Sequence, residues 1–187
     1  FFHQGTFRQG VAVFGSRLYS DDTSEIVGTF IHELGHLLGL GHPLLNQQLY
    51  GNNIEGLDDS SIFLATMDTN LPWNRDDINP DDIAGISVLY SNDRFTNELG
   101  SISGEVRKAD GSPMTHANVI ARNVSDPWCN AYSILSGISC DFSSIEICEQ
   151  YNMEDGSFSI NGLTPGTYTL EVEGFEDDEY VSTVAPG

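Results

Sequence analysis

Basic side chains are scarce in this chain of 187 residues. Lysine and arginine total 7 against 28 aspartates and glutamates, and the formal net charge is −21 at pH 7. The excess is shared, with 13 acids and 4 bases in residues 1–97 and 15 acids and 3 bases in residues 98–187. Such a surface repels phosphate backbones and anionic lipid headgroups. Nucleic acid and acidic membranes are therefore not expected partners.

Long apolar runs are also lacking. No stretch reaches the ~18 apolar residues that a membrane-spanning helix requires, and no basic-then-apolar leader is present. The chain begins at Phe1 rather than at methionine, so processing or a fragment would explain the missing leader. We expect a secreted, extracellular, periplasmic or cell-surface protein without a membrane span.

Cysteine is limited to three residues, Cys129, Cys140 and Cys148, with no C-x-x-C arrangement. A structural zinc site is disfavoured because a fourth ligand has no candidate at suitable spacing. In an oxidising compartment, one disulfide and one remaining thiol is the simplest assignment, and three pairings stay open.

The most informative segment is His-Glu-Leu-Gly-His-Leu-Leu-Gly-Leu-Gly-His at residues 32–42. On a helix, residues four apart lie about 40° apart, so His32 and His36 project from one face. The glycines that follow permit the chain to turn and return His42 as a third ligand. Glu33 lies beside the metal as a candidate general base. Three neutral imidazoles with one open position suit a catalytic zinc.

The alternative is an accidental histidine pattern, since lone histidines on apolar helices are usually core or surface residues. Five fixed positions are different, because a chance match in a chain of this length has a probability on the order of 10⁻⁴. A zinc site is therefore the better interpretation.

Two further sequence features lie downstream of the histidine run. Met67 follows the histidines, and residues 79–90 carry a proline at a helix start, first-turn acids and apolar residues at helical spacing. With the extended histidine run, this series resembles the metzincin clan of zinc endopeptidases, in which a Met-containing turn lies under the metal. Pro43 matches the serralysin-like branch, but Thr69 stands where that branch has tyrosine. The chain is therefore most similar to the matrixin family.

That resemblance implies a zincin-like catalytic domain with strands and a helix upstream of the zinc helix. Only 31 residues precede His32, so we expect an N-terminally incomplete domain with a short sheet. Val11–Phe14 reads as a short buried strand, which the resemblance would place at the substrate edge. The zinc helix is predicted over residues 23–39, with Ile26, Phe30, Leu34 and Leu38 as its core-facing stripe.

Two acidic loops are candidate binding sites for a second metal ion. Asn52–Asp59 and Asn74–Asp82 supply oxygen ligands of the type that calcium prefers, although no EF-hand spacing is present. A solvated acidic surface is the favoured alternative, and Asp81 and Asp82 are equally suited to the first turn of a helix.

After Tyr90 the pattern changes to period-two alternation broken by turns. Strands are predicted near 102–106, 117–121, 158–160 and 168–172, with turns at 110–113, 155–156 and 165–166. The series Gly-x-Val, Asp-Gly-Ser-Pro, Ala-Asn-Val and Asp-Gly-Ser-Phe-Ser-Ile-Asn-Gly-Leu-Thr-Pro-Gly-Thr-Tyr-Thr-Leu resembles the carboxypeptidase regulatory-like, prealbumin-type domain, with a Cys-bearing insertion near 125–150. Such a domain is a β-sandwich, here of about seven strands, and is usually accessory.

The sequence thus predicts an α+β protein with a metzincin-like zinc protease domain at 1–97 and an all-β sandwich at 98–187. The expected function is peptide-bond hydrolysis with Zn²⁺ held by His32, His36 and His42, Glu33 as general base and a protein or peptide substrate. The alternative is a non-catalytic zinc-binding fragment or adhesion module of a larger secreted protein. Oligomeric state is not predicted.

Overall fold

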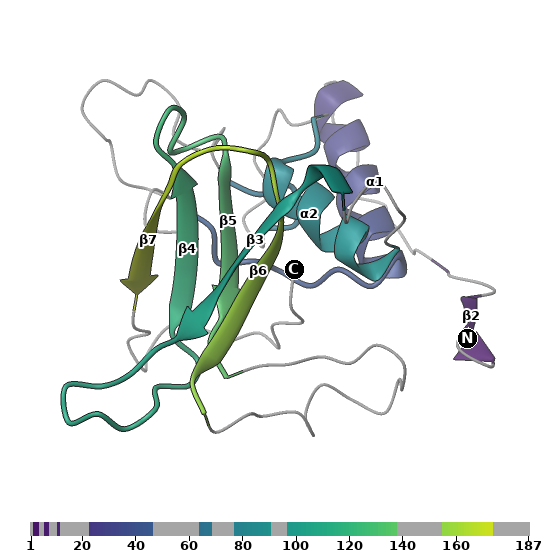
Figure 1. The fold of residues 1–187 in the computed structure, drawn as a ribbon. Coiled ribbons are helices and arrows are strands. Elements are labelled where there is room, and N and C mark those ends of the chain that lie inside the picture. Colours follow the sequence, from purple (N-terminus) through teal and green to yellow (C-terminus); the bar gives the residue numbers. More distant parts are fainter. Residues whose placement is uncertain are drawn as a thin grey trace.

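A computed structural model describes residues 2–3, 6–7, 11, 23–46, 64–68, 77–90, 97–137 and 155–173. Within these residues the protein is mixed α+β, as predicted, with two helices and antiparallel sheets (Figure 1). The elements are β1 (Phe2–His3), β2 (Thr6–Phe7), α1 (Thr23–Leu37), α2 (Pro80–Leu89), β3 (Gly100–Glu105), β4 (Asn118–Asn123), β5 (Ala131–Leu135), β6 (Ser157–Leu163) and β7 (Tyr168–Glu173). Neither described helix is long and apolar enough to cross a membrane.

Helix α1 confirms a helix at the predicted position, where residues 23–39 were expected to be helical. It ends two residues before Gly39, whose φ of 100° is a left-handed conformation that favours glycine. The predicted core stripe is wrong at Phe30 and Leu34, which are both 52% exposed. The buried positions on this helix are Gly28, His32 and Gly35, because α1 turns its histidine face inward.

Helix α2 begins as its sequence predicts. The Asn79 side chain caps it by accepting a hydrogen bond from the Asp81 backbone N–H at 2.9 Å, and Pro80 occupies the first helical position. Asp81 and Asp82 in the first turn are nevertheless buried, at 3% and 4% exposure. A burial this complete requires internal partners for both carboxyl groups.

Strands β3 to β7 form two sheets. Strand β3 pairs with β6, and β4 lies between β5 and β7, with every pair antiparallel. The four predicted strands are confirmed, whereas Ala131–Leu135 lies in the segment that was assigned to an insertion and is a strand. The described residues hold five strands in these two sheets, and a seven-stranded sandwich stays a prediction.

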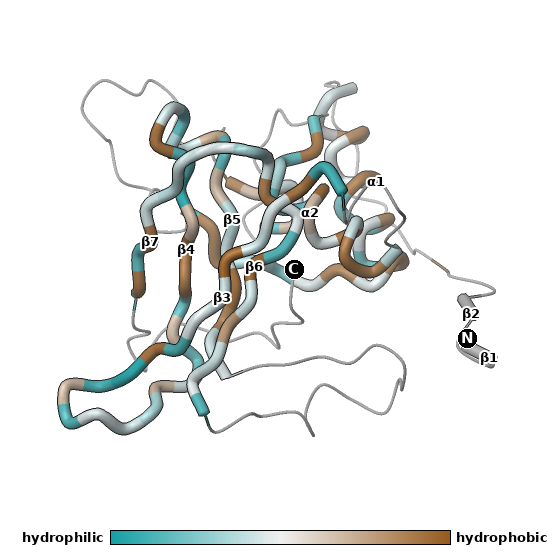
Figure 2. The backbone as a smooth tube through the Cα atoms, viewed as in Figure 1, coloured by the Kyte–Doolittle hydropathy of each residue, from teal (hydrophilic) through white to brown (hydrophobic). Residues whose placement is uncertain are grey.

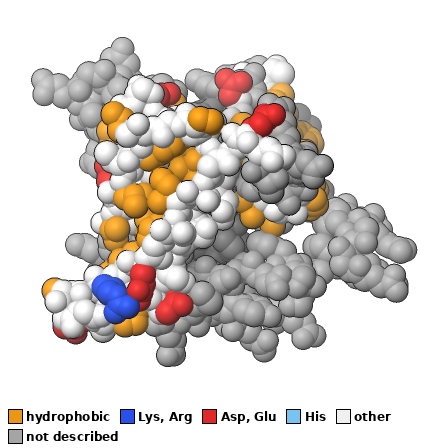
Figure 3. Space-filling view, viewed as in Figure 1, with side chains coloured by type: hydrophobic (Ala, Val, Ile, Leu, Met, Phe, Trp, Pro, Cys, Tyr) orange, Lys and Arg blue, Asp and Glu red, His pale blue; other side chains and the backbone are white. Residues whose placement is uncertain are grey.

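A shared hydrophobic core lies between the sheets and extends to α2. Its buried members come from β4, β5, β6, the loops beside them and α2: Ala84, Val106, Ala117, Val119, Ala121, Tyr132, Ile160 and Leu163. Figure 2 shows hydrophobic residues along these strands, interrupted by neutral and hydrophilic ones. Figure 3 shows a band of hydrophobic side chains that stays visible at the surface between the sheets. Because Ala84 belongs to this cluster, α2 and the sheets are packed as one body.

The N-terminal side is described only in part. Strands β1 and β2 pair as a small hairpin that lies away from the two sheets (Figure 1). Val11, predicted to be buried in a strand, is 69% exposed. Residues 12–14 lie outside the described residues, so the predicted substrate-edge strand stays a prediction.

Candidate metal centre

The three predicted histidines converge. Helix α1 places His32 and His36 one turn apart, with their Nε2 atoms 3.1 Å from each other. His42 arrives from the loop after the helix and brings its Nε2 to 3.2 Å from that of His32. One ligand atom from each residue lies within 4.8 Å of the others, and His32 is buried while its two partners are half-buried. The spacing in sequence therefore predicted the spatial cluster correctly.

The opposite ring nitrogens fix the orientation of two of these rings. His32 Nδ1 lies 2.9 Å from the Thr66 carbonyl oxygen, and His36 Nδ1 lies 2.9 Å from the Leu40 carbonyl oxygen. A carbonyl only accepts, so each Nδ1 carries the proton and each Nε2 presents a lone pair to the centre. Two lone pairs facing each other at 3.1 Å cannot form a hydrogen bond. A cation between them satisfies both.

The donor set and spacing fit zinc. Nitrogens at ~2.05 Å from a tetrahedrally coordinated ion lie ~3.3 Å apart, close to the two Nε2 separations here. Imidazole nitrogen is also a preferred zinc ligand, and carbonyl bonds to the second ring nitrogen are the usual outer support of such a ligand. The three residues can therefore hold a metal ion, with Zn²⁺ the ion that this donor set suits.

Electrostatics keep the third ligand in its metal-binding form. Burial lowers the pKa of His42, and the neighbouring His36 and His32 lower it further, while the negative charge of Glu33 opposes them. A lowered pKa leaves the His42 imidazole neutral at pH 7, as coordination requires. Glu33 is half-buried on α1, next in sequence to His32.

Met67 lies beneath the helix in a turn closed by a hydrogen bond from the Asp68 N–H to the Ala65 carbonyl at 3.1 Å. Its side chain is 2% exposed and packs against Gly35 on α1. The same turn supplies the Thr66 carbonyl that orients His32. The Met67 prediction therefore falls on a buried turn that contacts the histidine helix.

Asp82 fastens this turn, and the sequence did not predict that role. Its Oδ2 accepts a hydrogen bond from the Thr66 N–H at 2.7 Å, and its Oδ1 accepts one from the Met67 N–H at 3.2 Å. The Thr66 hydroxyl donates to the Asp77 carbonyl and accepts from the Asn79 N–H. Local pattern classified Asp82 as a helix-start acid or a calcium ligand. Its link to a turn 15 residues upstream has no periodic signature.

Asp81 faces the other way, toward the sheet. Its Oδ1 accepts a hydrogen bond from the Ser133 N–H of β5 at 2.8 Å. Burial and, to a lesser extent, the charge of Asp82 raise the pKa of Asp81 to about 8, against the opposing effect of the Ser133 hydrogen bond. The two adjacent acids thus tie α2 to the Met67 turn and to the sheet.

Several predictions lie outside the described residues. These are the acidic loop Asn52–Asp59, residues 74–76 of the predicted loop Asn74–Asp82, and both Cys140 and Cys148. Cys129 is exposed. The calcium sites and the disulfide therefore stay predictions.

No protein-family model matches the chain, and no curated protein and no solved structure matches it significantly. The histidine cluster and its surroundings are therefore the basis for assigning a class of protein and a function.

Proposed function

We propose that the protein is a zinc-dependent metalloendopeptidase. The observation that carries the proposal is the convergence of the His32, His36 and His42 Nε2 atoms, two of which present lone pairs to a common centre. The neighbouring carboxylate of Glu33 completes the set that peptide hydrolysis requires. A purely structural zinc site would be closed by a fourth protein ligand, whereas three histidines leave one position for water and substrate.

The chemistry follows from the residue types. A zinc ion held there would polarise the peptide carbonyl and lower the pKa of a bound water toward neutrality. Glu33 would accept the proton of that water on a carboxylate oxygen and pass it to the leaving amine nitrogen. The carbonyls of Thr66 and Leu40 would orient the rings of His32 and His36 so that each Nε2 faces the ion. Hydrolysis by this route forms no acyl-enzyme.

We further propose that the chain belongs to the matrixin-like metzincins, with residues 98–187 as a prealbumin-type accessory sandwich. The support is the histidine run, the buried Met67 turn beneath α1 and the acid pair that opens α2. We propose that the protein acts outside the cytoplasm, because the predicted disulfide would persist in an oxidising compartment and an acidic surface is common in secreted proteins.

The direct test is zinc analysis combined with cleavage of a denatured protein substrate. The proposal expects about one zinc per chain, cleavage that a chelator stops, and activity that returns when zinc is added back. Zinc binding without cleavage would instead support the non-catalytic zinc-binding module. A chain that binds no zinc would contradict both.

A further inference from the structure

The third ligand, His42, depends on a loop, and that loop is attached to the sheet. Leu45 is completely buried in a small cluster with Ile120 of β4 and Ala131 of β5. The next residue, Asn46, is also completely buried and has a φ of 60°. A left-handed, fully buried asparagine four residues after a ligand fixes the path of the chain that carries the ligand.

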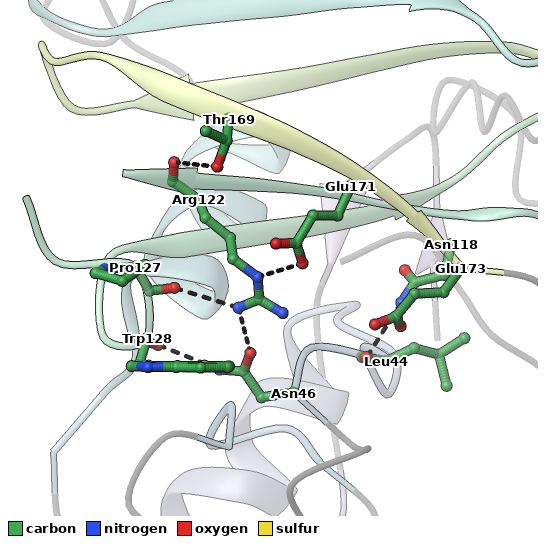
Figure 4. A network of polar contacts seen from close by, with 9 residues as sticks. All are labelled: Leu44, Asn46, Asn118, Arg122, Pro127, Trp128, Thr169, Glu171 and Glu173. Carbon is green, nitrogen blue, oxygen red and sulfur yellow. Dashed lines mark hydrogen bonds and ion pairs between the residues drawn. The ribbon is translucent and has the colours of Figure 1, made fainter. Parts of the chain in front are cut away.

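Arg122 of β4 makes the principal polar contact with this loop (Figure 4). Its Nη1 donates to the Asn46 Oδ1 at 2.5 Å and to the Pro127 carbonyl at 3.2 Å. Its Nε donates to Glu171 of β7 at 2.6 Å, and the guanidinium carbon lies 4.8 Å from the centre of the Trp128 ring. The Arg122 side chain is 3% exposed. This cation is therefore held from four directions, one of which is the ligand loop.

The loop is bound in return at two further points. Asn46 Nδ2 donates to the Trp128 carbonyl at 3.2 Å. Asn118, also on β4, donates from Nδ2 to the Leu44 carbonyl at 3.3 Å and to Glu173 at 3.1 Å. Figure 4 shows the Asn46 contact beside the guanidinium and the Asn118 contact as a separate group near Glu173. Residues 44–46 are thus hydrogen-bonded to β4 and the turn after it, more than 70 residues along the chain.

A buried arginine is a poor choice for stability alone. Guanidinium stays charged at any ordinary pH, and removing it from water costs free energy that a packed apolar side chain would not incur. One nitrogen, Nη2, is buried without a hydrogen-bond partner among the described residues. The arginine instead provides directed hydrogen bonds, because the planar guanidinium restricts where the Asn46 side chain can lie.

We propose that Arg122 is a positioning residue for the metal centre, acting through Asn46 to hold the loop that presents His42. The inference rests on the proposed zinc site. It makes the β4 strand part of the support of the ligand set. Outer-shell partners of metal ligands change metal affinity by roughly 10- to 100-fold when removed, and we expect an effect in the lower part of that range.

The test measures zinc dissociation constants by competition with a chromophoric chelator, and the visible absorption of the cobalt-loaded protein. Arg122→Met keeps the buried volume and removes the directed bonds. Asn46→Gly keeps the left-handed backbone and removes the same contact from the other side. Arg107→Met is the matched control, because Arg107 lies after β3, is 54% exposed and pairs with Glu105 at 2.7 Å.

We expect each of the two loop variants to raise the zinc dissociation constant by about tenfold or more and to alter the cobalt absorption bands. Arg107→Met should change neither. Urea unfolding of the metal-free variants shows whether they are folded, and Asn46→Gly decides the outcome if Arg122→Met is not. Wild-type zinc affinity in folded loop variants would overturn the positioning role alone. A wild-type protein without zinc affinity would overturn the proposed function and, with it, this role, whereas zinc binding without proteolysis would overturn only the endopeptidase.

Discussion

The thioether of Met67 occupies the space that a β-carbon on Gly35 would need. Gly35 is the last residue before His36 in the histidine run, and it lies on the buried face of α1. Any side chain there meets the Met67 sulfur and terminal methyl group. The close approach of helix and turn is therefore possible because this position is glycine.

We expect Gly35→Ala to destabilise the protein by about 1–3 kcal/mol, the usual cost of forcing an extra group into a packed interior. The added Met67→Ala change should recover part of that loss, because it removes the atoms that the new methyl group meets. A double-mutant cycle by urea unfolding measures this coupling. Leu34→Ala, at a half-exposed neighbour on α1, is the control. Additive effects of the Gly35 and Met67 changes would contradict the contact.

Asp82→Asn should loosen the Met67 turn. An amide oxygen can keep one of the two backbone N–H bonds, while its NH₂ group faces the other N–H, so we expect a loss of about 2 kcal/mol in unfolding free energy. Zinc affinity should fall as well, because the turn supplies the Thr66 carbonyl that orients His32. Asp77→Asn, at an exposed acid just before α2, serves as the control. Equal zinc affinity in the Asp82 and Asp77 variants would argue against this link.

Asp81 predicts an unusual pH dependence. Its pKa in the folded protein is raised to about 8, against ~3.9 in an unfolded chain. Between these values the folded state binds more protons at Asp81, so the contribution of this group to stability is complete below about pH 4 and declines as the pH rises toward 8, by at most ~1.4 kcal/mol per unit. Asp81→Asn should flatten this slope, since its amide oxygen still accepts from the Ser133 N–H.

Urea unfolding from pH 5 to 8 in the presence of a chelator measures the Asp81 effect without a contribution from metal loss. The wild-type curve minus the Asp81→Asn curve isolates this one group. A difference that does not change with pH would show that Asp81 is ionised in the folded protein throughout that range.

Glu33→Gln should separate metal binding from turnover. The amide keeps the size of the side chain and cannot accept a proton from water, so we expect at least about 100-fold lower turnover with wild-type zinc content. Zinc analysis and cleavage of a denatured protein check the two quantities on one sample. Undiminished cleavage would rule out Glu33 as the base.

His42→Ala should lower zinc affinity strongly, because two imidazoles on α1 then remain. His116→Asn is the matched control: His116 is another loop histidine, its φ of 61° is one that asparagine tolerates, and it lies outside the cluster. Chelator competition on both variants gives the comparison. A similar zinc affinity in the two would remove His42 from the ligand set.

The sequence predicted the histidine cluster because helical periodicity converts a spacing of four into a shared face. Helix α2 could be predicted equally well, since Asn79 and Pro80 are local signals for the start of a helix. Two turns that place a glycine in the left-handed region, at Gly111 and Gly156, were predicted for the same reason. In each case the determinant lies within a few residues of the element.

What escaped prediction depends on contacts between distant segments. Strand β5 was missed because both of its faces are covered, so Ser133, bonded to Asp81, interrupts the expected alternation. Phe30 and Leu34 gave the opposite error: their helical spacing predicted burial in the core, but both are exposed on α1. Arg122 gave only a weak signal, a charged residue directly after the apolar residues 119–121 of its strand.

Strand β4 has no face exposed to water, because one side lines the core between the sheets and the other receives the loop after His42. The sheet therefore cannot be exchanged without disturbing the loop that carries His42. If recombination replaced this sheet with an unrelated domain, Asn46 would lose its hydrogen-bond partners and Leu45 would be exposed to water. The new domain would need the same surface to receive residues 44–46. The histidine loop and its strand should therefore be inherited together.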